Sequence, residues 1–65
     1  MSADNGYVVR KNNQGEYVVS EYFASFGYPP IGQPGELVFD TIEDVFVWWQ
    51  DETPYCEYGL TFDIG

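Results

Sequence analysis

Two runs of mostly apolar residues near the start of the chain have the pattern of β-strands. Both runs, Tyr7–Lys11 and Glu16–Phe23, are rich in β-branched and aromatic residues, which favour strands. Between them, Asn12–Gly15 is dominated by residues that tolerate the backbone of a tight turn. We therefore predict a β-hairpin. Ahead of it, the polar segment Met1–Gly6 contains Asn5-Gly6, which indicates a turn.

Apolar residues recur with a helical period in the second half of the chain. The apolar stripe consists of Ile42, Val45, Phe46 and Trp49. Asp40, with Glu43 three residues later, matches a capping box, and Thr41 is the alternative N-cap. Trp48 falls at the border between the apolar stripe and the polar face. The helix is expected to end before Pro54, because residues that precede a proline avoid the α region.

Two further segments complete the predicted fold. Gly27–Gly35 contains three prolines and three glycines, so we expect an irregular surface connection held in place by Tyr28 and Ile31. Apolar and polar residues alternate in Glu57–Ile64, which predicts a half-buried last strand. We therefore predict one α+β domain over residues 1–65. Its order is β-β-α-β, with a three-stranded, mostly antiparallel sheet that carries one helix on one face.

The charge of the chain is its strongest compositional signal. Two basic and eleven acidic residues give a net charge of −9, while a 20% aromatic share argues for a folded chain. A domain of this length is about 28 Å across, so its charge density is within about a factor of two of the one charge per ~1.7 Å of duplex DNA. Such a surface excludes direct binding to nucleic acid or anionic lipid and attracts a basic partner. Solubility alone is the competing explanation.

Catalytic chemistry has little support in the composition. Histidine is absent, so the side chain best suited to general base work near neutral pH is missing. The single cysteine, Cys56, has no candidate base beside it, and we expect a small filler or a surface thiol. The adjacent pairs Glu43-Asp44 and Asp51-Glu52 do not face each other on a helix. We expect no enzyme activity, no cofactor and no dedicated metal site.

The candidate partner-binding residues gather on one side of the predicted helix. Asp44, Trp48 and Asp51 follow an i, i+4, i+7 pattern, which places the two carboxylates about 10.5 Å apart along the axis. Such a row can meet arginine or lysine side chains that normally hold phosphates, with Trp48 as a stacking anchor. In the alternative interpretation, Trp48 packs under the loop at Gly27–Gly35 and the carboxylates are only solvated.

Hairpin carboxylates extend this predicted surface. Strand parity places Glu16 and Glu21 on opposite faces of the sheet, so the two cannot belong to the same flat patch. The residues expected to contact a partner are Glu43, Asp44, Trp48, Asp51, Glu52, Glu16 and Glu21.

Short segments at both ends carry a resemblance. Ser2–Val8, which begins Ser-Ala-Asp-Asn-Gly, and Glu57–Leu60, with its Glu-Tyr-Gly strand, resemble the ends of a group of small acidic phage-encoded proteins. In size and acidity the chain is also similar to anti-CRISPR inhibitors, several of which mimic the charge of DNA. The resemblance implies a phage protein that acts in the cytoplasm of its bacterial host. It carries no catalytic residue over to this chain.

These observations lead to one hypothesis and two alternatives. We expect an acidic, non-enzymatic inhibitor of the anti-CRISPR type. It would bind a basic DNA-binding groove of a bacterial defence complex, with a CRISPR effector subunit as the candidate partner. An inhibitor of another DNA-processing enzyme and a small accessory interaction module without DNA mimicry are the alternatives. The N-terminus lacks the pattern of a signal peptide and no run approaches a membrane span. The charge opposes self-association, so we expect a monomer.

Overall fold

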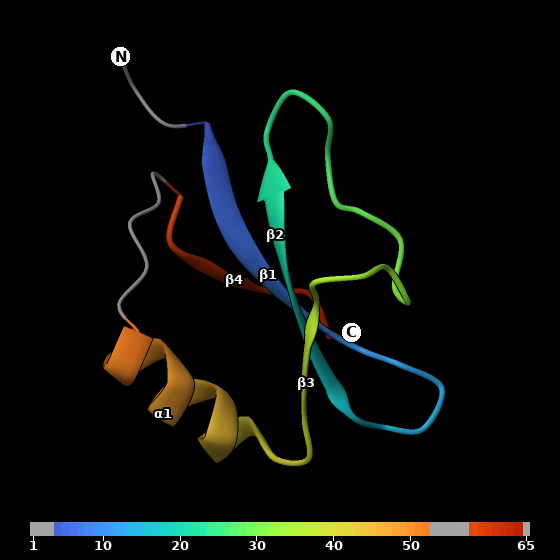
Figure 1. The fold of residues 1–65 in the computed structure, drawn as a ribbon, viewed down its shortest axis with the longest axis vertical. Helices are drawn as coiled ribbons and strands as arrows, with labels where there is room; N and C mark the ends of the chain where they lie inside the picture. Colours follow the sequence, from blue (N-terminus) through green and yellow to red (C-terminus); the bar gives the residue numbers. More distant parts are fainter. Residues whose placement is uncertain (1–3, 53–57, 65) are drawn as a thin grey trace.

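Four strands and one helix make up the fold in the computed structural model, which describes residues 4–52 and 58–64 (Figure 1). In chain order the elements are β1 (Asn5–Lys11), β2 (Tyr17–Phe23), β3 (Leu37–Phe39), α1 (Ile42–Glu52) and β4 (Leu60–Phe62). The helix covers one face of the sheet, and the long connection between β2 and β3 passes over the other (Figure 1). The radius of gyration is 11.5 Å.

The predicted hairpin is confirmed, and one side chain organises its turn. The Oδ1 atom of Asn12 accepts hydrogen bonds from the backbone N–H groups of Gln14 and Glu16, each at 3.0 Å. The side-chain amide of Asn12 also donates to the Glu16 carboxylate at 3.0 Å. Gly15 adopts a φ of 79°, a conformation that glycine reaches without a steric penalty. The turn sets the antiparallel register in which Val9 lies opposite Val19.

The turn predicted at Asn5-Gly6 is wrong, because both residues belong to β1. Gly6 lies opposite Tyr22, and the aromatic ring covers the space that a side chain at Gly6 would fill. A Cβ atom at this position would lie 2.9 Å from the Tyr22 hydroxyl oxygen. The side-chain amide of Asn5 donates to the Glu21 carboxylate across the strand pair at 2.8 Å. Cross-strand contacts therefore outweigh the local turn preference.

The α+β class is confirmed, but the predicted three-stranded sheet is corrected to a mixed sheet of four strands. The order is β3-β2-β1-β4, with β3 antiparallel to β2 and β4 parallel to β1. The added strand β3 is three residues long and follows a segment rich in proline and glycine, so alternation along the chain could not reveal it. Alternation also carries no information on whether the last strand pairs in a parallel or an antiparallel direction.

Thr41, and not Asp40, caps the helix. The backbone N–H of Asp44 donates to Thr41 Oγ1 at 3.2 Å, which is the N-cap to N3 hydrogen bond. The start expected at Asp40 is therefore wrong and the alternative cap is confirmed. The structure has α1 over Ile42–Glu52, and the end predicted before Pro54 falls at residues 53–57, outside the described ranges.

One apolar cluster joins the helix to the sheet. Val45 from α1 packs against Val9 and Val19 from the central strands, and all three are buried. Half-buried side chains surround this cluster: Tyr7, Tyr17, Phe39, Trp48 and Leu60.

The connection between β2 and β3 protects the second face of the sheet. Val8 and Val18, on this face, are fully buried. Tyr28 packs edge-on against Tyr22, with ring centroids 4.8 Å apart, and the Arg10 guanidinium lies 5.8 Å from the Tyr28 ring. The expectation that Tyr28 holds this segment is thus confirmed.

Parts of the predicted last strand lie outside the described residues. The structure has β4 over Leu60–Phe62, shorter than the predicted Glu57–Ile64. Cys56 and Glu57 belong to residues 53–57, which fall outside the described ranges. Within the described ranges, no helix is long and apolar enough to cross a membrane.

Candidate functional site

Two ring contacts fix how α1 sits on the sheet. Val45 faces the sheet. At about 100° per residue, Trp48 and Phe46 project to opposite sides of the Val45 direction around the helix axis. The Trp48 ring lies 6.1 Å from Phe39 in β3, whereas the Phe46 ring lies 5.6 Å from Phe62 in β4. One side of the helix therefore faces the β3 edge of the sheet and the other faces the β4 edge.

The β3 side of the helix carries two of the predicted carboxylates. Asp44 and Asp51 project roughly 100° and 120° from the direction of Val45, on the same side as Trp48. Both are exposed. Seven residues of helix separate them by about 10.5 Å along the axis. We call this pair the acidic flank.

Trp48 stands between the acidic flank and the core. It is half-buried, and its ring contacts Tyr7 at 5.5 Å and Trp49 at 5.9 Å between centroids. The alternative in which it packs under the Gly27–Gly35 loop is wrong, because that loop covers the opposite face of the sheet. Trp48 is primarily a packing residue that leaves part of its surface beside the two carboxylates.

An exposed valine, which was not among the predicted binding residues, lies at the centre of the outer helix face. Val47 is 56% exposed. Its neighbours one turn away on the helix surface are Glu43, Asp44 and Asp51, all exposed. The sequence could have indicated this residue, because helical spacing places the apolar Val47 about 160° from the sheet-facing direction. An apolar centre with a carboxylate rim has the layout of a protein-binding patch.

Both ends of the helix carry negative charge. Glu43 and Asp44 occupy the first turn, where they complement the positive end of the helix dipole. The last turn contains Asp51 and Glu52 and has no basic residue. Carboxylates at this negative end cost stability, since a cation is the favoured residue there. The acidic last turn is therefore not explained by the stability of the isolated domain.

The two hairpin carboxylates lie apart from each other. Glu21 is exposed and opposite Tyr7, on the helix side of the sheet, where it accepts the hydrogen bond from Asn5. Glu16 precedes β2 and is tied to Asn12 in the turn. Five residues of extended chain separate the two by about 17 Å. Only Glu21 lies on the face that carries α1.

The two cations of the chain are engaged with aromatic rings. The Lys11 ammonium lies 5.3 Å from the centre of the Tyr17 ring, and the Arg10 guanidinium lies over Tyr28. Arg10 also donates to the Ser20 hydroxyl at 3.5 Å. Within residues 4–52 and 58–64, no carboxylate forms an ion pair with either of them. The acidic surface is thus not neutralised internally.

In the described part of the chain, no three Asp, Glu or Cys side chains gather closely enough to hold a metal ion. No family model, curated protein or solved structure matched this chain.

Proposed function

We propose that this chain is an acidic inhibitor that occupies a basic DNA-binding surface of a bacterial protein. The observation that carries the proposal is the acidic flank, Asp44 and Asp51, exposed on one side of α1 beside the half-buried Trp48. The net charge of −9 supplies the long-range attraction that steers such a partner into contact.

The spacing of the flank suits a surface that normally holds a nucleic acid strand. Successive phosphates of one strand advance by about 3.4 Å along the axis of duplex DNA. The separation of about 10.5 Å between Asp44 and Asp51 along the helix therefore corresponds to about three steps. Arginine and lysine side chains placed for phosphates can reach both carboxylates, while Val47 supplies an apolar contact that loses water.

The acidic last turn of α1 supports a binding role. Asp51 and Glu52 weaken the helix that they terminate, yet both are exposed and neither fills space in the core. A cationic partner docked on this turn would offset that cost. A DNA-binding subunit of a CRISPR effector is the partner we propose first, and another DNA-processing enzyme presents the same chemistry.

Competition with DNA tests this proposal. The full chain is immobilised and exposed to a bacterial lysate, and the retained proteins are then challenged with duplex DNA. We expect the retained proteins to be DNA-binding proteins that duplex DNA releases. In a gel-shift assay with a purified retained protein, the chain should displace the DNA. Retained proteins that duplex DNA does not release would contradict the proposal.

One observation favours a second function, an interaction module that uses an apolar anchor. Phe26 is 88% exposed in the turn after β2. The turn is held by hydrogen bonds from the Phe26 N–H to the Phe23 carbonyl oxygen at 2.9 Å and from Ser25 to the Asp4 carboxylate. A rigidly presented aromatic ring of this kind can fill a pocket on a partner. Under this alternative, Phe26→Ala would abolish retention and Asp51→Lys would not.

A further inference from the structure

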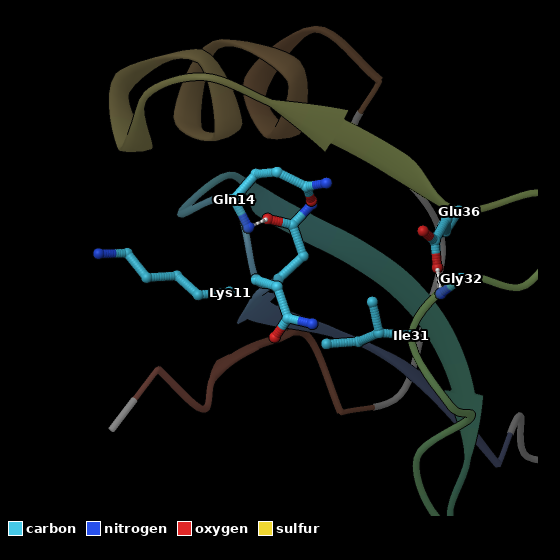
Figure 2. A pocket seen from close by; sticks show the side chains of 7 residues that line it. Lys11, Gln14, Ile31, Gly32 and Glu36 are labelled. Carbon is cyan, nitrogen blue, oxygen red and sulfur yellow. Dashed lines mark hydrogen bonds between the residues drawn. The ribbon is translucent and has the colours of Figure 1, made fainter.

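A polar hollow of about 370 Å³ lies between the hairpin turn and the loop before β3 (Figure 2). Asn13 and Gln14 line it from the turn, and Ile31 and Glu36 line it from the loop. Figure 2 shows the Ile31 side chain pointing toward the side chains of the turn. The hollow thus combines amide groups, an apolar wall and one carboxylate.

The carboxylate of Glu36 is held in a fixed position. Its Oε1 atom accepts a hydrogen bond from the Gly32 N–H at 2.8 Å (Figure 2). Gly32 adopts a φ of 101°, which strongly favours glycine at this point of the loop. Glu36 is half-buried, and it also lines a second hollow of about 260 Å³ beside Ser20. A preorganised carboxylate between two hollows presents its other oxygen to an incoming donor.

The arrangement of charge around the hollow favours a cationic ligand over an anionic one. Lys11 is the one basic residue in its lining, but the Lys11 ammonium lies over the Tyr17 ring at 5.3 Å. Figure 2 shows the Lys11 side chain extending away from Glu36. Asn12 is committed to the turn through both of its side-chain polar atoms. The charge directed at a ligand is therefore that of Glu36.

We propose that this hollow binds the guanidinium group of an arginine from a protein partner. A guanidinium has five N–H donors in a planar fork, which matches a carboxylate and leaves donors for neighbouring amide oxygens. Both Glu36 oxygens accept from the fork, Oε1 through the lone pair that the Gly32 N–H leaves unused. The side-chain oxygens of Asn13 and Gln14 take the remaining donors, and Ile31 packs against the methylene stem. The assignment of that arginine to a DNA-binding partner rests on the proposed function, whereas the chemistry of the hollow does not.

Titration with a small probe tests the hollow without the partner. Amide signals of the full ¹⁵N-labelled chain are followed by NMR as N-acetyl-arginine amide is added. We expect saturable shifts centred on Gln14, Gly32 and Glu36. Glu36→Gln keeps an oxygen for the Gly32 N–H but removes the charge, and it should weaken binding by about tenfold or more. Asp63→Asn, which removes the same charge after β4 at the opposite edge of the sheet from β3, should leave the affinity within about twofold.

Two further arms make the outcome decisive. N-acetyl-lysine amide should bind several-fold more weakly than the arginine probe, and equal binding would refute recognition of a guanidinium. A blocked Gly-Arg-Gly peptide should shift the same signals, and failure of the peptide alone would assign the hollow to a free guanidine compound. Shifts that are scattered over the chain, or that Glu36→Gln does not weaken, would refute the guanidinium site. The proposed function, which the DNA competition tests, would not be affected. Normal probe binding without DNA-releasable partners would refute the proposed function alone.

Discussion

Trp48 packs edge-on against Tyr7, with ring centroids 5.5 Å apart and an angle of 69° between the rings. This contact joins the helix to the central strand β1, and Trp49 approaches the same tyrosine at 6.1 Å. The indole is therefore a structural bridge between the two layers. Its substitution is expected to affect folding before it affects binding.

Replacing Trp48 tests this assignment. Trp48→Ala removes ring contacts with Tyr7, Phe39 and Trp49, and we expect a loss of about 2–4 kcal/mol, since the ring is half-buried. Trp48→Phe keeps an aromatic ring and should lose clearly less. Urea denaturation followed by Trp49 fluorescence measures both. An unchanged midpoint for Trp48→Ala would show that the indole does not bridge the layers.

The helix cap gives a prediction with a built-in control. Thr41→Ala removes the acceptor of the Asp44 N–H and should lower the free energy of unfolding by about 1 kcal/mol. Asp40→Ala changes the neighbouring exposed residue and should stay within about 0.5 kcal/mol of the parent. Thermal or urea unfolding measures both losses. A larger loss for Asp40→Ala than for Thr41→Ala would identify Asp40 as the cap.

Gly6 is expected to resist substitution because of its cross-strand neighbour. Gly6→Ala places a Cβ atom 2.9 Å from the Tyr22 hydroxyl oxygen and 3.0 Å from ring carbons. We expect a loss of about 1–3 kcal/mol. In a Tyr22→Ala background the same change should cost much less, which a double-mutant cycle measures. If Gly6→Ala lowered the free energy of unfolding equally in both backgrounds, the loss would not arise from contact with the Tyr22 ring.

Local chemistry predicted some elements of the fold better than others. The hairpin turn was predictable because Asn12 and Gly15 organise it without distant contacts. The helix was predictable because its stripe has a strong period, although the choice between Asp40 and Thr41 depended on side-chain geometry. Strand β3 was not predictable, since its three residues form a strand only by pairing with β2.

The candidate site was predictable in part. Helical spacing placed Asp44 and Asp51 on one side of α1, and the structure keeps them there. The position of Trp48 depended on which sheet face the helix covers, and the alternation of β1 and β2 does not decide that. The hollow at Glu36 could not be predicted from the sequence, because it forms only where a long irregular loop meets the hairpin turn.

Binding to the partner should depend steeply on salt. Charge steering between an acidic flank and a basic surface is screened as the ionic strength approaches the physiological range. We expect retention on the immobilised chain to fall between low and physiological salt, and the double variant Asp44→Lys/Asp51→Lys to show a flatter dependence. Retention that is independent of salt would favour the apolar alternative centred on Phe26.

Asp51→Lys, compared with Asp63→Lys, is the most direct test of charge mimicry by the acidic flank. Both changes move the net charge from −9 to −7 at an exposed position, but only Asp51 belongs to the flank. Lysine in the last turn of α1 suits the helix dipole and should raise the free energy of unfolding by about 0.3–1 kcal/mol. A weaker complex therefore could not be attributed to unfolding.

The deciding measurement is the affinity of both variants for a partner that duplex DNA releases. We predict that Asp51→Lys weakens binding by about tenfold or more while the chain becomes more stable, and that Asp63→Lys retains most of the affinity. Equal losses in the two variants, or full affinity in Asp51→Lys, would contradict the account.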